Sequence, residues 1–123
     1  KIMNMQKKKT GKLFQFCCSA PAIISGASKK TIREMSIIGE ELGLLFQIAD
    51  DLLDIKGIKR KVGKPLNKDK KKGKSTLIKL FGYEKTLEFA LRRKKTIISK
   101  LKKYGNKSRK LVELTDFILD RSY

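Results

Sequence analysis

The sequence predicts an all-α protein, and two observations lead to that fold class. Apolar residues recur at helical spacing along most of the chain, most clearly between residues 29 and 56. Apolar and polar residues nowhere alternate as they do in a half-buried strand. The 123 residues are enough for at most one domain, so we expect one bundle of helices, which we treat as a single partial domain over residues 1–123.

The first two expected helices meet at a short turn. Residues 1 to about 25 form the first helix, and Gly11 within it indicates a bend or a close approach of another backbone. The segment Ser-Gly-Ala-Ser at residues 25–28 ends this helix and begins the next. Ser28 or Thr31 is the expected N-cap, and Thr31 has the spacing of a capping box with Glu34.

The second helix is expected to run from about Lys29 to Lys56. Residues 57–73, which contain Gly63, Pro65 and Asn67, are expected to be irregular. Loops of this length within a compact domain are uncommon and often functional. Further helices are expected at 77–81, at 83–103 and from 107 to about 120.

The composition narrows the possible functions. The chain has 31 Lys and Arg against 12 Asp and Glu, a net charge of +19, which suits nucleic acid first and an anionic membrane surface second. It has no histidine, which excludes histidine triads and histidine-bound zinc. Adjacent cysteines such as Cys17 and Cys18 rarely bridge, so we expect no disulfide framework and a cytoplasmic protein. No apolar run approaches the roughly 18–20 residues of a membrane span.

A cluster of carboxylates interrupts the apolar second helix. On a helix, Gln47, Asp50 and Asp54 share one face and Asp51 lies beside it. No Lys or Arg occurs between residues 37 and 55 to neutralise these acids, and apolar residues flank them on both sides. Mg²⁺ prefers carboxylate oxygen and is often shared with substrate phosphates, so the cluster predicts a magnesium site.

A basic segment follows the carboxylates directly. Residues 56–74 contain ten Lys or Arg and one acid, Asp69. A basic loop next to a metal-binding acidic turn is typical of a site for a phosphorylated small molecule, held between cation and lysine. We therefore interpret residues 57–73 as a basic active-site loop.

Four motifs in order resemble one enzyme family. They are Lys9-Thr10-Gly11, the run from Gly39 to Asp54, Gly63-Lys64, and the run from Gly73 to Thr76. Together they resemble the C-terminal half of a trans-prenyl diphosphate synthase of the polyprenyl synthetase family, most closely the bacterial farnesyl and geranylgeranyl diphosphate synthases. The resemblance covers nearly the whole chain and implies the C-terminal portion of an isoprenoid-synthase-type helical bundle.

The resemblance implies a reaction and a role for each site residue. Mg²⁺ assists the ionisation of an allylic diphosphate, isopentenyl diphosphate attacks the resulting cation, and a proton leaves. The implied metal ligands, direct or through water, are Asp50, Asp51 and Asp54. The implied diphosphate-binding residues are Lys9, Lys64 and Lys74. The implied catalytic residues are Lys9 with Thr10 and Gln47, whose oxygen dipoles would stabilise the allylic cation.

The sequence also departs from the family pattern. It lacks the first aspartate-rich motif, the arginine pair after it and the isopentenyl diphosphate site, and Ile58 stands where many relatives have Asp. We therefore expect a C-terminal fragment that binds diphosphate weakly at most and turns nothing over alone. The resemblance implies a homodimer for the full-length enzyme, with no nucleic acid and no stable membrane insertion.

Three alternatives stay open at this point. Within the same fold family, a head-to-head condensing synthase or a terpene cyclase shares much of this chemistry. A basic helical module for nucleic acid or anionic membrane explains the net charge, although the acidic cluster would repel phosphate in the absence of metal. A catalytically idle partner subunit is the third. Product length also stays open between farnesyl and geranylgeranyl types.

Overall fold

The structure, a computed structural model, describes residues 10–61 and 77–120, with side chains for 10–55 and 77–120. Within these ranges every regular element is a helix and there is no strand, which confirms the all-α prediction. The elements are α2 (Lys12–Ile24), α3 (Lys29–Lys61), α4 (Leu77–Phe81), α5 (Tyr83–Lys102), the 3-10 helix η2 (Gly105–Ser108) and α6 (Arg109–Asp120).

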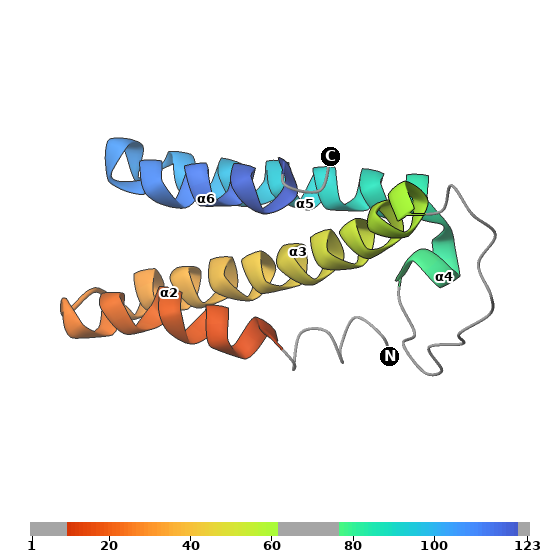
Figure 1. Cartoon of the computed structure of the whole chain (residues 1–123). Helices are drawn as coiled ribbons and strands as arrows, with labels where there is room; N and C mark the ends of the chain where they lie inside the picture. Colours follow the sequence, from red (N-terminus) through yellow and green to blue (C-terminus); the bar gives the residue numbers. More distant parts are fainter. Residues whose placement is uncertain (1–9, 62–76, 121–123) are drawn as a thin grey trace.

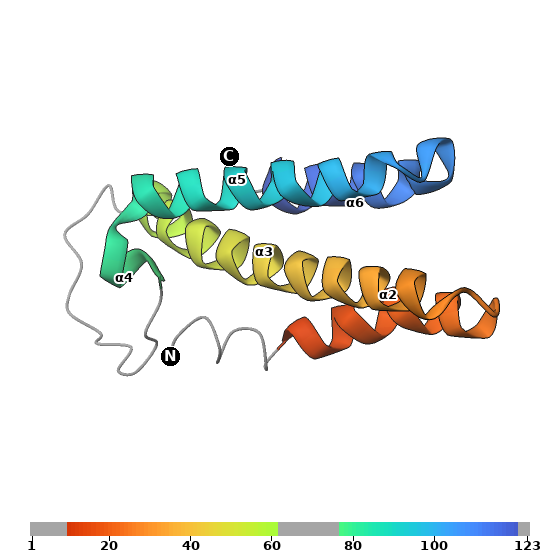
Figure 2. The ribbon, with the colours of Figure 1, turned by 180° about the vertical axis from the view of Figure 1, so that it is seen from behind.

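The helices form two antiparallel hairpins, α2–α3 and α5–α6, and the second hairpin packs against α3, which is the central element. Figures 1 and 2 show α2 along one side of α3 and the α5–α6 hairpin along the other, with the short α4 near the C-terminal end of α3. The turns of the two hairpins lie at the same end of the molecule, opposite α4 (Figure 1). In the described part of the chain, no helix is both long enough and apolar enough to cross a bilayer.

The core gathers around the middle of α3. The middle of α3 is buried on more than one face. Leu42, Leu44 and Leu45 all have zero exposure, although Leu44 points to a different side of the helix from the other two. Helices α4, α5 and α6 contribute smaller patches to the same core. The buried apolar residues are Ile38, Leu42, Leu44, Leu45, Ile48, Ala49, Leu52, Leu77, Ile78, Ala90, Ile97, Leu101, Ile118 and Leu119.

Glycines bring the backbones of α2 and α3 into direct contact. A Cβ added at Gly43 would lie 2.6 Å from the Cα of Gly11, and a Cβ added at Gly39 would lie 2.7 Å from the Cα of Gln15. Neither glycine position leaves room for a side chain, since the nearest atoms belong to the backbone of residues 11–15, at the start of α2. The close backbone approach expected at Gly11 is therefore confirmed.

The turn between α2 and α3 has defined caps on both sides. Gly26 has φ +68°, and the amides of Gly26 and Ala27 donate to the carbonyls of Ile23 and Ala22, which is a Schellman motif. Ser28 caps α3, since its Oγ accepts a hydrogen bond from the amide of Thr31 at 3.2 Å. Of the two expected N-caps, Ser28 is therefore confirmed.

The alternative N-cap and the end of α3 need correction. Thr31 lies inside α3 and does not cap it, because the helix already begins at Lys29. Helix α3 continues to Lys61, so the first five residues of the loop expected at 57–73 are helical. A glycine inside a helix costs only about 1 kcal/mol relative to alanine, and Gly57 therefore does not end this one. Residues 62–73 lie outside the described residues.

The remaining boundaries agree closely with the sequence. Helix α4 has the expected bounds, and Gly82 after it has φ +81°. Helix α5 ends one residue earlier than expected, at Lys102. The last segment begins as the 3-10 helix η2 and becomes α-helical only at Arg109.

Ion pairs join the second hairpin to α3 and hold it together. Arg93 on α5 donates two hydrogen bonds to Glu41 on α3, at 3.0 and 3.2 Å. Lys94 lies 3.0 Å from Asp116 and 3.1 Å from Asp120, both on α6. Burial alone would lower the pKa of Lys94, but the two carboxylates outweigh that effect and raise it.

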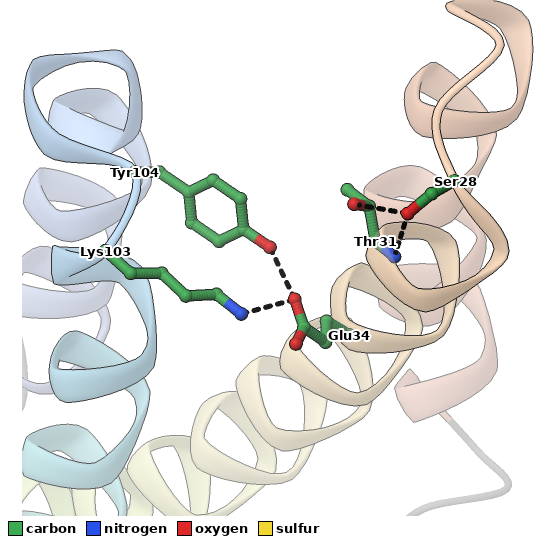
Figure 3. A network of polar contacts seen from close by, with 5 residues as sticks. All are labelled: Ser28, Thr31, Glu34, Lys103 and Tyr104. Carbon is green, nitrogen blue, oxygen red and sulfur yellow. Dashed lines mark hydrogen bonds and ion pairs between the residues drawn. The ribbon is translucent and has the colours of Figure 1, made fainter.

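A second contact, which we name the clamp, joins the start of α3 to the end of α5. Glu34 accepts hydrogen bonds from Lys103 and from the Tyr104 hydroxyl, the latter at 2.8 Å (Figure 3). These bonds lower the pKa of Glu34. The hydrogen bond from Lys103 to Glu34 raises the pKa of Lys103. Burial, followed by the separate hydrogen bond from Tyr104 to Glu34, raises the pKa of Tyr104. The side chain of Glu34 therefore bonds to Lys103 and Tyr104 and does not form a capping box with Thr31.

The glycine contact predicts a large effect from one added methyl group. Gly43→Ala should destabilise the fold by about 1–3 kcal/mol, because the added carbon meets the Gly11 backbone. Thermal unfolding followed by circular dichroism measures this loss. Ser99→Ala on the exposed side of α5 is the control and should stay within about 0.5 kcal/mol of the parent. Equal stability of Gly43→Ala and the parent would contradict the close contact.

The clamp predicts a stability that depends on pH. Because the folded pKa of Glu34 lies below its ordinary value of 4.5, its contribution is complete above pH 4.5 and is lost as the pH falls further. The contribution of Lys103 is complete below its ordinary value of 10.5 and is lost as the pH rises through the higher folded pKa. The melting-temperature difference between the parent and Glu34→Gln should therefore be largest between these limits.

A double-mutant cycle tests whether the clamp acts as a unit. The effects of Glu34→Gln and Lys103→Gln should be smaller together than their sum, because each variant removes the same ion pair. Additive effects at neutral pH would show that the two side chains are energetically independent.

Candidate functional site

The carboxylate cluster lies within α3 and not at its end. Helix α3 carries the polypeptide seven residues beyond Asp54 before it ends at Lys61. Ile48 and Leu52 are fully buried on the core side, whereas Asp50 and Asp51 are half-buried and Asp54 is exposed. The helix therefore anchors its apolar side in the core and presents the carboxylates at the border between core and solvent.

The start of α2 meets α3 one turn before these carboxylates. The Gln47 Nε2 donates a hydrogen bond to the Thr10 Oγ1. Thr10 and Gly11 belong to a π-helical turn, a wider turn that is frequent at functional sites. The rings of Phe14 and Phe46 pack with their centroids 5.5 Å apart and so fix the two helices beside this bond. The structure thus brings together Thr10 and Gln47, two of the three predicted catalytic residues.

The contact between Thr10 and Gln47 depends on the glycines described above. Gly43 lies four residues before Gln47, one helical turn away, and touches Gly11, the residue that follows Thr10. A larger residue at either glycine would separate the two backbones and thereby the two polar side chains. The sequence analysis considered Gly11 alone, although the four-residue spacing of Gly39 and Gly43 was a signal that α3 has a smooth face for close packing.

The carboxylates fit Mg²⁺ that is held together with a substrate. Their oxygen atoms are the ligands this ion prefers, and Asp50 and Asp54 are one helical turn apart. In the described part of the chain, no three Cys, Asp or Glu side chains are grouped so that they could hold a metal by themselves. Mg²⁺ usually takes one or two carboxylates and completes its coordination with water and phosphate oxygen, so a prebuilt protein cage is not required.

The predicted diphosphate-binding lysines, Lys9, Lys64 and Lys74, lie outside the described residues. Lys9 directly precedes Thr10 in the chain, and the other two belong to the segment that joins α3 to α4. Their role stays a prediction, as does metal binding by the three aspartates.

The cysteines take no part in this site. Cys17 and Cys18 are both free, as the sequence predicted. Burial, and secondarily the neighbouring Cys17, raises the pKa of the Cys18 thiol. A raised pKa leaves less thiolate at neutral pH, so Cys18 is a poor nucleophile.

Comparison with known proteins gives a consistent result over most of the chain. The model of the polyprenyl synthetase family matches residues 1–115. Farnesyl diphosphate synthase of Geobacillus stearothermophilus is 41% identical over 88 residues, which are 69% of this chain and 30% of the relative. Geranylgeranyl diphosphate synthase of Sulfolobus acidocaldarius is 38% identical over 112 residues, 91% of this chain and 32% of the relative.

A third relative extends the match to nearly the full chain. Farnesyl diphosphate synthase of Bacillus subtilis is 32% identical over 125 aligned residues, covering 99% of this chain and 41% of the relative. The chain thus spans between 30% and 41% of the length of these three relatives.

The bond between Gln47 and Thr10 predicts a measurable effect on stability. Thr10→Val keeps the shape of the side chain but removes the acceptor, which should cost about 1–3 kcal/mol because the half-buried Gln47 amide loses its partner. Thr10→Ser retains the hydroxyl and should lose clearly less. Chemical denaturation of both variants compares them, and a loss in Thr10→Val no larger than that in Thr10→Ser would contradict a stabilising role of the hydrogen bond.

Proposed function

This chain belongs to the polyprenyl synthetase family, and we propose that it provides the diphosphate-ionising part of a trans-prenyltransferase. The proposed reaction condenses isopentenyl diphosphate with an allylic diphosphate to give a farnesyl- or geranylgeranyl-type diphosphate. Relatives that bear the names farnesyl and geranylgeranyl diphosphate synthase support this choice. The observation that carries the proposal is the bond between Gln47 and Thr10 one turn before Asp50, because it joins two motifs that are 37 residues apart.

The carboxylates have the first role in the proposed reaction. Asp50 and Asp54 lie on one face of α3 and would hold Mg²⁺, with Asp51 beside them as a ligand or as an acceptor for bound water. Bound Mg²⁺ supplies positive charge at the leaving diphosphate, which lowers the barrier to its departure. The buried apolar side of α3 keeps the carboxylates in a fixed orientation during this step.

Thr10, which lies just before α2, and Gln47 on α3 have the second role in the proposed reaction. The Thr10 and Gln47 oxygens are neutral, so they can stabilise a neighbouring allylic cation without trapping it as a covalent adduct. Their mutual hydrogen bond restricts both side chains before substrate arrives, and such preorganisation is the main source of electrostatic stabilisation in enzymes. Lys9, which precedes Thr10, would bind the departing diphosphate together with Lys64 and Lys74.

The proposed reaction also needs groups that these 123 residues do not contain. The first aspartate-rich motif of the family and a site for isopentenyl diphosphate are absent from the sequence. We therefore propose that the chain is inactive alone and acts as part of a longer, homodimeric enzyme. The free cysteines support the accompanying proposal of a cytoplasmic location.

An activity assay on the longer protein that contains this chain tests the proposal. Incubation with isopentenyl diphosphate, geranyl diphosphate and Mg²⁺ should yield a longer prenyl diphosphate. Asp50→Asn should lower the turnover number by at least about a hundredfold, the scale of losing one preorganised electrostatic group. Asp120→Asn removes the same charge from the surface of α6 and should leave turnover unchanged.

Two results would contradict the proposal. The first is full turnover in Asp50→Asn, and the second is a longer protein that folds, binds Mg²⁺ and forms no product. The 123-residue chain alone should form no product in the same assay.

A further inference from the structure

We name the end of the molecule opposite α4 the tip and define it as residues 23–34 and 100–113. It contains the α2–α3 turn and the α5–α6 turn, which lie at the same end in both views (Figures 1 and 2). Two observations join its halves. The clamp bonds Glu34 to Lys103 and Tyr104 (Figure 3), and a cavity of about 510 Å³ is lined by Ser25 and Ala27 from one turn and by Tyr104 and Leu111 from the other.

Among the residues with described side chains, positive charge is concentrated at the tip. The tip holds nine Lys and Arg and only two acids, whereas the other residues with described side chains hold seven Lys and Arg against nine acids. The nine basic residues are Lys29, Lys30, Arg33, Lys100, Lys102, Lys103, Lys107, Arg109 and Lys110, and all are exposed. Within this part of the chain, lysines and arginines are therefore not spread evenly over the surface.

The two acids of the tip are each shared between two donors. Glu34 accepts from Lys103 and Tyr104, and Glu113 accepts from Arg109 at 2.8 Å and from Lys110 at 3.2 Å. These carboxylates therefore reduce the positive field only locally. The remaining basic side chains give the tip a strongly positive potential.

Exposed aliphatic side chains accompany this charge. Ile23 is 58% exposed and Ile24 is 85% exposed, and both lie in the last turn of α2. They are next to the Schellman turn and near the basic start of α3. Exposed aliphatic side chains next to a basic segment suit the interface of an anionic bilayer, where lysines meet lipid phosphates and aliphatic groups enter the acyl boundary.

From this arrangement we infer that the tip docks on an anionic lipid bilayer, with Ile23 and Ile24 entering its interface. RNA fits the surface less well, because binding without sequence preference relies on aromatic side chains that stack on bases. Tyr104 is the aromatic residue of the tip, and its hydroxyl is bonded to Glu34 while Lys103 lies over its ring, 5.0 Å from the centroid. The aliphatic pair has no counterpart in an RNA complex.

This inference goes beyond the proposed enzymatic function and does not depend on it. The tip lies at the N-terminal end of α3, and the carboxylate cluster lies toward the C-terminal end of the same helix (Figure 1). Docking by the tip would attach the protein to a membrane while leaving the carboxylates away from the lipid. No bilayer-spanning helix is involved, since the attachment is peripheral.

Sedimentation with lipid vesicles tests the inference on the 123-residue chain. The chain should sediment with vesicles made of equal parts phosphatidylcholine and phosphatidylglycerol. It should stay in the supernatant when the vesicles contain only phosphatidylcholine. Lys29→Gln with Lys107→Gln should weaken binding by about twentyfold, since each lysine near an anionic surface contributes roughly a fivefold factor. Lys85→Gln with Lys95→Gln removes the same charge from the exposed side of α5 and should weaken binding much less.

Matched apolar variants test the second part of the surface. Ile24→Ser should weaken vesicle binding, whereas Leu80→Ser on α4, a residue that is 60% exposed, should not. The inference is overturned if the chain ignores anionic vesicles at low salt, or if the tip and α5 lysine pairs contribute equally. It is also overturned if the tip variants lose binding to single-stranded RNA but keep binding to vesicles.

Discussion

The backbone contact between α2 and α3 is the constraint on which the rest of this structure depends. Two helix backbones can touch only where a residue facing the other helix has no side chain, and Gly39 and Gly43 meet that condition against the backbones of Gln15 and Gly11. The contact puts Phe14 against Phe46 and Thr10 against Gln47, so the apolar packing and the polar pair of the site result from the same glycines. The helix that carries the carboxylates is positioned by this contact on one side and by α5 and α6 on the other.

The side chains of α3 change in character along the helix, so that its two ends serve different purposes. Near its start, Glu34 and the neighbouring basic residues belong to the tip, and Glu34 bonds to Lys103 at the end of α5. In its middle, leucines on several faces hold the core together. Toward its end, Asp50 and Asp54 lie where core gives way to solvent. One rigid helix thus links the surface that we assign to a membrane with the carboxylates that we assign to diphosphate chemistry.

Most helix boundaries followed from local patterns. Apolar periodicity and the glycines at 26 and 82 placed the helices, because these signals act within a few residues of the chain. The predicted end of α3, at Lys56, was wrong. Gly57 is only a weak helix breaker, and local signals do not measure the stability that the rest of a long helix gives to its last turns. Of the predicted site residues, Thr10 and Gln47 are in contact, which spacing alone had not established because 37 residues separate them.

The sequence by itself determined the fold class, the order of the helices and the types of chemical group available, because periodicity, turn residues and carboxylate spacing are local properties. The family likewise followed from motifs whose order is written in the chain. The tertiary structure alone decided which groups meet: Thr10 with Gln47, Glu34 with Lys103, and the two hairpin turns that gather nine basic residues at one end. Those contacts depend on how helices pack against each other, and helix packing is set by side chains far apart in the sequence.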